Sequence, residues 1–404
     1  MERLSGFLRV NARWLAAGFL LTFASSFGQT FFIAVFAGEI RTAFGLSHGA
    51  WGAIYAIATT SSALVMVYAG SLTDRFRVRH IGLGVLIGLA LAALAMSRVT
   101  EVWMLVVVIF LLRLIGQGLM GHAAMVAMAR WFVATRGRAV SIAGLGVATG
   151  EALLPLVFVA LLGVLDWRML WLFASAALLA LAPILWRFLR AERTPQSFAG
   201  DPGGTGMKDR MWSRTEVLRH PVFWLMVPAL LGPAAWNTAF FFQQVHLAEA
   251  KGWTHATLVS LCPLYTFISV GFMLLAGGLV DRYGSHRLAA VYLLPVAAGY
   301  LVLATTGSVP AGALAVVLMG AGTGMHVTMM ATFWAETFGT RHLGSIRAMM
   351  AAIMVLGTAL GPAITGALID TGIAFPTQSY VIAAYFLTAA ALAAVAGRLA
   401  KSRF

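Results

Sequence analysis

Cysteine and charge are both scarce in this sequence. The chain has one cysteine in 404 residues, Cys262, which excludes an intramolecular disulfide and a metal cluster built from cysteines. Only 10% of its residues are charged, which excludes an ordinary soluble globular domain. A Gly-x-Ser-x-Gly nucleophile elbow, a His-Glu-x-x-His zinc pair and a Walker phosphate loop are also lacking. We therefore expect no enzyme, no bound metal and no cofactor.

Long apolar runs fill the chain instead. Hydrophobic residues make up 60% of it, and its mean hydropathy is +0.88. A helix needs about 20 apolar residues to cross a bilayer, whereas the strands of a membrane barrel alternate in polarity, which these runs do not. The sequence predicts an all-α integral membrane protein with twelve transmembrane helices. The runs cover residues 14–36, 50–70, 80–98, 101–125, 138–162, 168–190, 221–246, 256–278, 287–306, 309–331, 344–367 and 378–398.

The excess of basic residues lies mainly on one side of the expected membrane. The formal net charge is +14, a value that also occurs in proteins that bind nucleic acid. If the amino terminus is cytoplasmic, the loops on that side hold 23 of the 28 Lys and Arg residues. This asymmetry is the positive-inside pattern, and it predicts a multi-pass protein of the inner membrane with both termini in the cytoplasm. We expect the basic loops to contact anionic lipid head groups and not nucleic acid.

The chain divides into two similar halves. Residues 191–214 are rich in Pro, Gly and charge, which predicts a cytoplasmic linker between six-helix bundles at 1–190 and 215–404. The stretch GSLTDRFRVRH, which begins at Gly70, is repeated as GGLVDRYGSHR from Gly277, and the same offset of 207 residues superposes GLSH on GWTH. Six helices in each half leave both copies in the same orientation, as in the parallel repeats of secondary transporters.

These motifs resemble those of the major facilitator superfamily. GSLTDRFRVR is similar to the signature between that family's second and third helices, and the copy at Gly277 is similar to its weaker second signature. RLIGQG at Arg113 and GLGVATGEALLP at Gly144 resemble the helix-four and helix-five motifs. Within the family, ARWFVATRGRAVSIAGLGVATG and the later DWR are similar to the monocarboxylate and oxalate/formate carriers. The arginine that this branch usually carries in helix eight is missing from 256–278.

Two charged residues lie near the middle of expected spans, where a charge costs about 2.5–3.5 kcal/mol. Arg113 in the fourth run and Glu151 in the fifth reach similar depths and could pair. Either they only lock the two helices together, or Arg113 meets a substrate anion and Glu151 takes up a proton. Close helix packing is expected at the neighbouring glycines, which are Gly116, Gly118, Gly146 and Gly150.

Other polar side chains extend this candidate site. Amides need hydrogen-bond partners in an apolar environment, and tyrosines at helical spacing mark a polar helix face. The candidate substrate-binding residues are Arg113, Gln29, Tyr55, Asn237, Gln243, Tyr265 and His326. His122 joins Glu151 as a candidate for proton coupling. It is nine positions from Arg113, which places it on the opposite face of the helix, where packing is the alternative role.

The repeated signature supplies candidate gating residues. Asp74 and Arg75 lie where the second helix reaches the cytoplasm, and Asp281 and Arg282 lie at the equivalent end of the eighth. An acid and a base there can bridge neighbouring helix ends in one state and separate in the other, which predicts a conformational latch. The further basic residues of the two copies are Arg79 and Arg287.

The sequence as a whole predicts a monomeric secondary transporter. Its expected substrate is a small organic anion, similar to a monocarboxylate, which moves by alternating access with proton coupling. The alternative is a proton-driven exporter of hydrophobic or cationic compounds. In that case Glu151 is the binding carboxylate and the 26 phenylalanines and 12 tryptophans line the cavity.

Overall fold

The protein is helical throughout its described part. The computed structural model describes residues 4–69, 72, 76–132, 135–190, 206–339 and 342–401. Ten helices in these ranges are long and apolar enough to cross a membrane. A pair at Gly6–Gly28 and Thr30–Phe44, bent by 46°, makes one more candidate span, and Leu294–Thr305 is a shorter apolar helix. These segments coincide with the twelve apolar runs, so the predicted membrane fold is confirmed.

The helices form two compact units. The first unit holds residues 1–46 and 57–201, and the second holds 47–56 and 202–404. The boundary at 201 falls inside the predicted linker. The one difference from the expected halves is the segment 47–56, which belongs to the second unit although it is the beginning of a helix that continues into the first.

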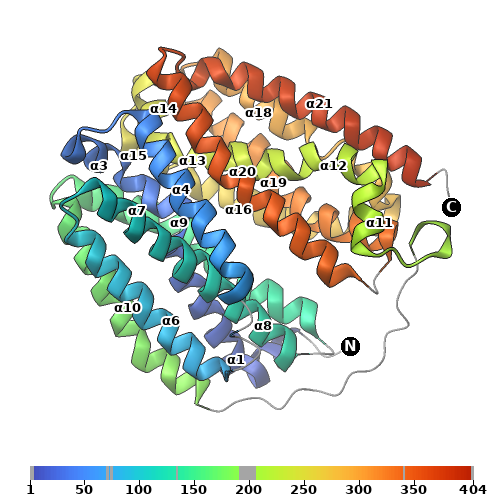
Figure 1. The fold of residues 1–404 in the computed structure, drawn as a ribbon, viewed down its shortest axis with the longest axis horizontal. Helices are drawn as coiled ribbons and strands as arrows, with labels where there is room; N and C mark the ends of the chain where they lie inside the picture. Colours follow the sequence, from blue (N-terminus) through green and yellow to red (C-terminus); the bar gives the residue numbers. More distant parts are fainter. Residues whose placement is uncertain are drawn as a thin grey trace. The chain divides into compact units, whose positions relative to one another are not determined.

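The first unit contains the helices drawn from blue to green in Figure 1. They are α1 (Leu4–Ser25), η1 (Ser26–Gly28), α2 (Thr30–Ile33), η2 (Ala34–Phe36), α3 (Ala37–Phe44), the part of α4 (His48–Ala69) that follows residue 56, α6 (Val78–Ser97), α7 (Val102–Leu111), η3 (Leu112–Met120), α8 (Gly121–Trp131), α9 (Arg136–Leu162) and α10 (Trp167–Leu189). The first predicted span is thus α1 to α3 with breaks, and the fourth is α7, η3 and α8, of which η3 is a π-helix.

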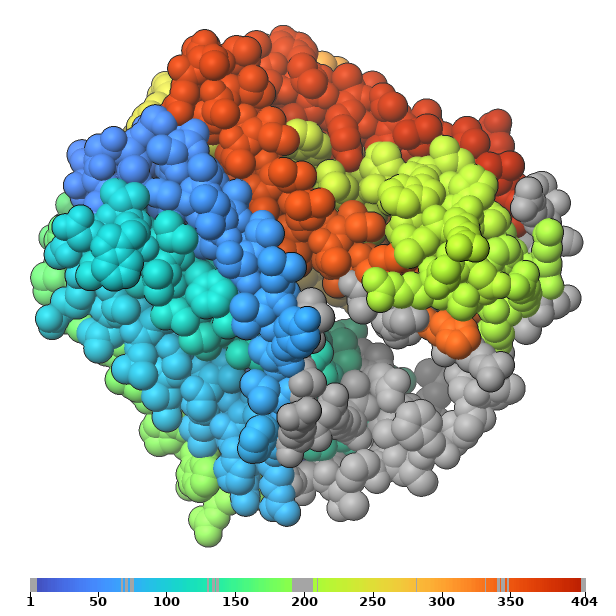
Figure 2. All heavy atoms as spheres, viewed as in Figure 1, coloured from blue at the N-terminus to red at the C-terminus, as the bar shows by residue number. Residues whose placement is uncertain are grey.

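The second unit contains the helices drawn from yellow-green to red. They are η4 (Met207–Asp209), α11 (Arg214–Arg219), α12 (Pro221–Gly232), η5 (Pro233–Asn237), α13 (Thr238–Phe242), α14 (Gln244–Lys251), α15 (His255–Val259), α16 (Cys262–Tyr283), α17 (Ser285–Leu288), α18 (Leu294–Thr305), α19 (Val309–Phe338), α20 (Leu343–Asp370) and α21 (Phe375–Lys401). In Figure 2, α12 and α20 lie side by side on one surface of this unit.

Glycines let α9 lie directly against α1. A Cβ atom on Gly146 would collide with the carbonyl oxygen of Phe19 and the hydroxyl of Thr22, and one on Gly150 would collide with the hydroxyl of Ser26. Close approach of this kind is how helices gain van der Waals contact in a membrane, where no hydrophobic effect drives them together. The predicted packing role of these two glycines is confirmed.

A proline in the second unit leaves one backbone carbonyl without its helical donor, and a tyrosine bonds to that carbonyl. Pro233 has no N–H, so it cannot donate to the carbonyl oxygen of Ala229 one turn earlier. The hydroxyl of Tyr292 donates to that oxygen at 3.1 Å. Because lipid offers no water to an unpaired carbonyl, such a bond is needed wherever a spanning helix is interrupted.

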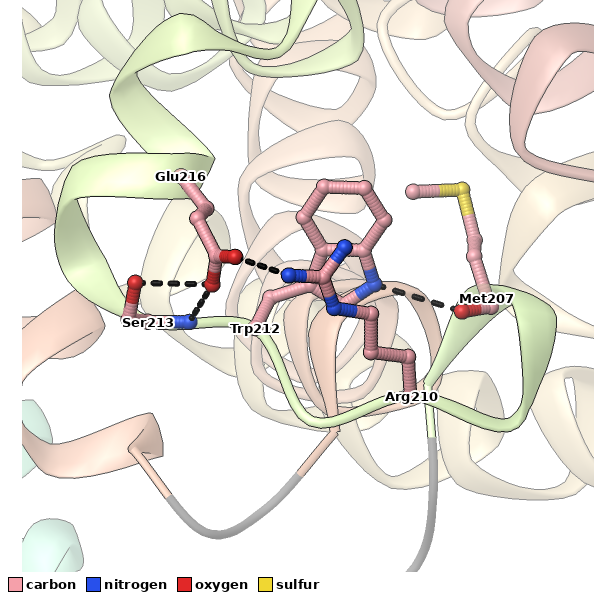
Figure 3. A network of polar contacts seen from close by, with 5 residues as sticks. All are labelled: Met207, Arg210, Trp212, Ser213 and Glu216. Carbon is pink, nitrogen blue, oxygen red and sulfur yellow. Dashed lines mark hydrogen bonds and ion pairs between the residues drawn. The ribbon is translucent and has the colours of Figure 1, made fainter.

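A short polar network anchors the start of the second unit (Figure 3). The hydroxyl and backbone N–H of Ser213 donate to the carboxylate of Glu216 at 2.7 and 2.8 Å, which caps the beginning of α11. Arg210 bonds to the same carboxylate, and the indole of Trp212 donates to the Met207 carbonyl at 3.2 Å. These bonds, the Ser213 backbone bond above all, lower the pKa of Glu216 below its usual range.

Gly146→Ala should destabilise the protein, because the added methyl group has no space between α9 and α1. We expect a loss of about 1–3 kcal/mol, seen as a melting temperature several degrees lower in detergent. Gly144→Ala is the matched control, since a Cβ there meets nothing within 4 Å. Equal melting temperatures for the two variants would contradict this packing account.

Glu216→Gln should loosen the cap of α11. Because the pKa of Glu216 in the folded state lies below its ordinary value of 4.5, the ionised carboxylate stabilises the folded state at any pH above 4.5. This stabilisation is lost as the pH falls through the lower pKa of the folded state. Hydrogen exchange in residues 210–219, corrected for intrinsic rates, should rise in wild type below about pH 4. In the variant it should already be high at pH 7. The control is Glu249→Gln, at an exposed position. Hydrogen exchange in Glu216→Gln that equals that of wild type at pH 7 would refute the cap.

Candidate functional site

The first span is broken at Gln29. This residue has an extended backbone (φ −85°, ψ 156°) between η1 and α2. The break leaves nearby backbone groups without the continuous helical ladder that a membrane normally requires. Gln29 itself is half-buried. A predicted substrate-binding residue therefore lies at the point where the helix is interrupted.

Arg113 reaches this break from η3. Its side chain is 1% exposed, and its Nη1 donates to the carbonyl oxygen of Gly28 at 3.3 Å and to the hydroxyl of Thr30 at 3.2 Å. These two acceptors lie on either side of Gln29. A guanidinium carries five donors in a fixed fork, so it suits a site where several acceptors converge.

A contact between two glycines makes this approach possible. A Cβ on Gly116 would lie 2.7 Å from the Cα of Gly28, and a Cβ on Gly28 would lie 2.8 Å from the Cα of Gly116. Any larger residue at either position would push η3 away from the break and move Arg113 out of reach. The predicted packing role of Gly116 is therefore confirmed. Gly118 is less tightly packed, since a Cβ added there would lie 3.1 Å from the sulfur of Met66.

The two candidate proton-coupling residues differ in exposure. Glu151 is half-buried on α9, next to the glycine that packs on Ser26 of η1. The side chain of His122, on α8, is exposed, whereas Arg113 is buried. The packing role and the proton-coupling role of His122 both stay predictions. The pairing of Arg113 with Glu151 stays a prediction.

Asn237 is the polar candidate in the second unit whose bonding is incomplete. It is 8% exposed at the end of η5, and its Nδ2 donates to the hydroxyl of Thr323 at 2.8 Å. Its Oδ1 is buried and accepts no hydrogen bond from the described part of the chain. A buried amide oxygen without a donor is costly, so Asn237 is suited to accept a hydrogen bond from a solute or a water.

Gln243 and Tyr55 have packing partners in the second unit. The Nε2 of Gln243 lies 3.4 Å from the Pro362 carbonyl oxygen and 3.3 Å from the Thr365 hydroxyl, which ties the break between α13 and α14 to α20. Tyr55 is fully buried with its ring centroid 4.7 Å from that of Phe242. Both predicted residues thus contribute to packing.

Tyr265 and His326 are buried elsewhere in the same unit. Tyr265 lines a cavity of about 10 Å³ together with Gln244 and Cys262, which is space for about one water. His326 is 6% exposed, and its Nδ1 lies 3.4 Å from the hydroxyl of Tyr292. Neither contact shows an open binding cavity.

The candidate latch is described only in part. Asp74 and Arg75 lie outside the described residues, as does the side chain of Asp281. The guanidinium of Arg282 lies over the ring of Tyr283 at 5.3 Å, and Arg287 is exposed. The Nε of Arg79 lies 3.2 Å from His80 Nε2. The latch therefore stays a prediction.

Sequence reasoning missed the carboxylate that holds the start of α4. Asp370, the last residue of α20, accepts hydrogen bonds from the Ser47 hydroxyl at 2.6 Å and from the backbone N–H groups of His48 and Gly49 at 2.9 and 2.7 Å. An anion at a helix N-terminus is favoured by the unpaired N–H groups and the helix dipole. Ser47 before an apolar run was a visible signal of a helix start, but nothing in the sequence pairs it with Asp370.

A second missed residue is Glu336 of α19. It accepts a hydrogen bond from the hydroxyl of Ser285, and one of its oxygens lies 3.6 Å from His286 Nδ1. Ser285 and His286 belong to the second copy of the repeated signature. The end of that signature is thus attached to α19 within its own unit.

Comparisons with known proteins agree with this architecture. The family model of the Major Facilitator Superfamily matches residues 18–362. A bacterial homologue of the human lysosomal transporter Spinster, solved inward-facing and unoccupied, has a TM-score of 0.76 at 17% identity over 98% of both chains. The inward-facing, occupied form of the same homologue has a TM-score of 0.68 at 17% sequence identity, over 96% of both chains. The nucleoside transporter NupG, solved as a mutant, has a TM-score of 0.67 at 12% sequence identity, over 97% of this chain and 100% of its own. No curated protein sequence matches significantly.

Asp370→Asn should release the first turn of α4, because the variant loses the negative charge that faces its N–H groups. Hydrogen bonds to a charged group contribute about 1.5–3 kcal/mol, so exchange of the amides in residues 47–52 should become at least roughly tenfold faster. Asp166→Asn is the control, since Asp166 caps α10 through the N–H of Arg168. Unchanged exchange in residues 47–52 would show that Asp370 does not hold this turn.

Proposed function

This chain is a member of the major facilitator superfamily, and we propose that it moves a small organic anion across the membrane by proton-coupled alternating access. The family and the solved neighbours are those of a multi-pass membrane transporter and not of an enzyme. The substrate, the coupling ion and the location in an inner membrane with both termini cytoplasmic are parts of the proposal.

The observation that carries the proposal is the position of Arg113. It places a permanent positive charge inside a spanning segment, against a carbonyl and a hydroxyl at the broken first helix. An arginine does not lose its proton at any physiological pH. A small anion that reaches the break can therefore form a strong, charge-assisted interaction with this guanidinium.

Glu151 provides a route to proton coupling. We propose that its carboxylate and the substrate anion compete for Arg113. When Glu151 takes up a proton it no longer attracts the guanidinium, and the anion binds in its place. Anion and proton then move in the same direction, because each stabilises the state that the other requires.

Asn237 supports recognition of a solute that carries a donor as well as a charge. Its buried Oδ1 can accept a hydrogen bond from a hydroxyl group, while its Nδ2 stays fixed by Thr323. A small hydroxy acid carries such a hydroxyl group as well as a carboxylate. This fits the resemblance to monocarboxylate carriers, which the family match alone leaves open.

The contact made by Asp370 is our candidate for a gate. Residues 47–56 belong to the second unit, while α4 continues from Ile57 into the first. We propose that residues 47–56 separate from α20 when the transporter changes conformation. In the conformation of this structure, the bonds to Asp370 hold them against α20. The candidate latch residues of the repeated signature then act at the opposite helix ends.

The alternative, an exporter of hydrophobic or cationic compounds, has less support. It requires aromatic side chains that line a cavity. In the first unit, however, Phe32 packs its ring against those of Phe27, Phe158 and Trp171, with centroids 4.8–5.2 Å apart. These rings are a packed cluster, which leaves them little surface for a ligand.

Arg113→Gln should abolish transport and leave the protein folded, because glutamine keeps a donor for the break but has no charge. Counterflow of labelled lactate in proteoliposomes should fall at least roughly tenfold, while Arg113→Lys should retain part of it. The control is Arg168→Gln, which removes an arginine that also donates to a carbonyl, that of Val99. If Arg113→Gln transports like wild type, the residue has only a packing role.

Glu151→Gln should uncouple transport from protons. The variant should exchange labelled lactate for unlabelled lactate, since an amide resembles the protonated acid, but a pH gradient should no longer drive accumulation. Glu101→Gln, at the exposed start of α7, serves as the control. Accumulation that still follows the pH gradient in Glu151→Gln would rule out the proton-carrier role.

A further inference from the structure

A basic groove lies between α1 and α10 of the first unit. It has a volume of about 830 Å³ and is lined by Ala12, Arg13, Ala16, Arg187, Phe188 and Arg190. Of the lining residues that the structure describes, half are arginines and none is an acid. The two alanines are one helical turn apart on α1, and their small side chains leave space beside the arginines.

Arg13 is held in place at this groove. Its Nε donates to the Phe188 carbonyl oxygen at 3.1 Å, and its Nη2 donates to the carbonyl oxygen of Arg187. Both carbonyls lie in the last turn of α10, where helical carbonyls have no partners within the helix. These two bonds use two of the five guanidinium donors, so Arg13 caps α10 and still presents N–H groups beside the groove.

The surroundings of the groove are those of a membrane interface. Ile184 and Trp186 are each 45% exposed on α10 immediately before the arginines, and Val10 on α1 is 74% exposed. Exposed aliphatic side chains are suited to acyl chains, and tryptophan is enriched at the level of lipid head groups. The groove is thus positioned where a lipid phosphate lies, with apolar surface on the side of the acyl chains.

We propose that this groove binds the phosphate group of an anionic phospholipid. Arg187 and Arg190 are exposed and positively charged, and guanidinium groups bind phosphate oxygens in a bidentate manner. A zwitterionic lipid also carries a phosphate, but its positively charged ammonium group is repelled by three arginines. The site is separate from Arg113 and from the proposed transport reaction, and it depends only on the membrane fold.

The test is a lipid titration of the purified full-length protein in detergent, followed by native mass spectrometry. Phosphatidylglycerol should bind with at least roughly tenfold higher affinity than phosphatidylcholine. The double variant Arg187→Gln/Arg190→Gln should lose this preference. Arg214→Gln/Arg219→Gln removes the same charge from two exposed positions on α11 and should keep it.

A second variant separates a built site from general attraction between charges. Ala12→Phe fills the groove and leaves every arginine in place, and it should also weaken phosphatidylglycerol binding several-fold. Inorganic phosphate is titrated in a separate experiment, because a soluble phosphate compound offers the arginines the same phosphate oxygens as a lipid does. Competition by millimolar phosphate with the lipid supports a phosphate site, and tighter binding of the lipid identifies the membrane as the source.

Three results would overturn the proposal. The first is equal binding of the two phospholipids to wild type. The second is an equal loss in the groove variant and in the α11 control, which would indicate diffuse attraction. The third is full lipid preference in Ala12→Phe. Melting temperatures of all variants establish that each is folded.

Discussion

The bonds between Arg113 and the broken first span are the constraint on which the first unit depends. A membrane helix cannot be interrupted unless other groups bond to the backbone that the break exposes. Here the guanidinium bonds to the Gly28 carbonyl and to Thr30, just beyond the break. The glycine contact between η1 and η3 brings the arginine close enough. One residue thus stabilises a local break and places a positive charge there.

The second unit meets the same constraint with neutral groups. Pro233 leaves the Ala229 carbonyl without its usual donor, and Tyr292 replaces that donor. The interruption between α13 and α14 is bonded by Gln243 to α20. The two units therefore share a repeated architecture but differ in the charge at their breaks. Because of this difference, we assign anion recognition to Arg113 and an auxiliary, hydrogen-bonding role to Asn237.

Local patterns predicted much of this architecture. Long apolar runs identified the spans because lipid contact requires about 20 apolar residues in a row. The cost of a buried charge singled out Arg113, and the glycines beside it marked helix contacts. The break at Gln29, the π-helix of η3 and the Asp370 contact were not predictable in this way. The Asp370 contact, for example, joins two residues that are 323 positions apart in the sequence.

Binding of two solutes that differ only in charge tests the central claim most directly. Propionate and propionamide have nearly the same size and shape, and only the first is an anion at neutral pH. The account predicts that propionate raises the melting temperature of the purified wild-type protein in a saturable manner, beyond an equal concentration of sodium chloride, and that propionamide does not. Equal stabilisation by both solutes, or stabilisation by organic cations alone, would contradict it.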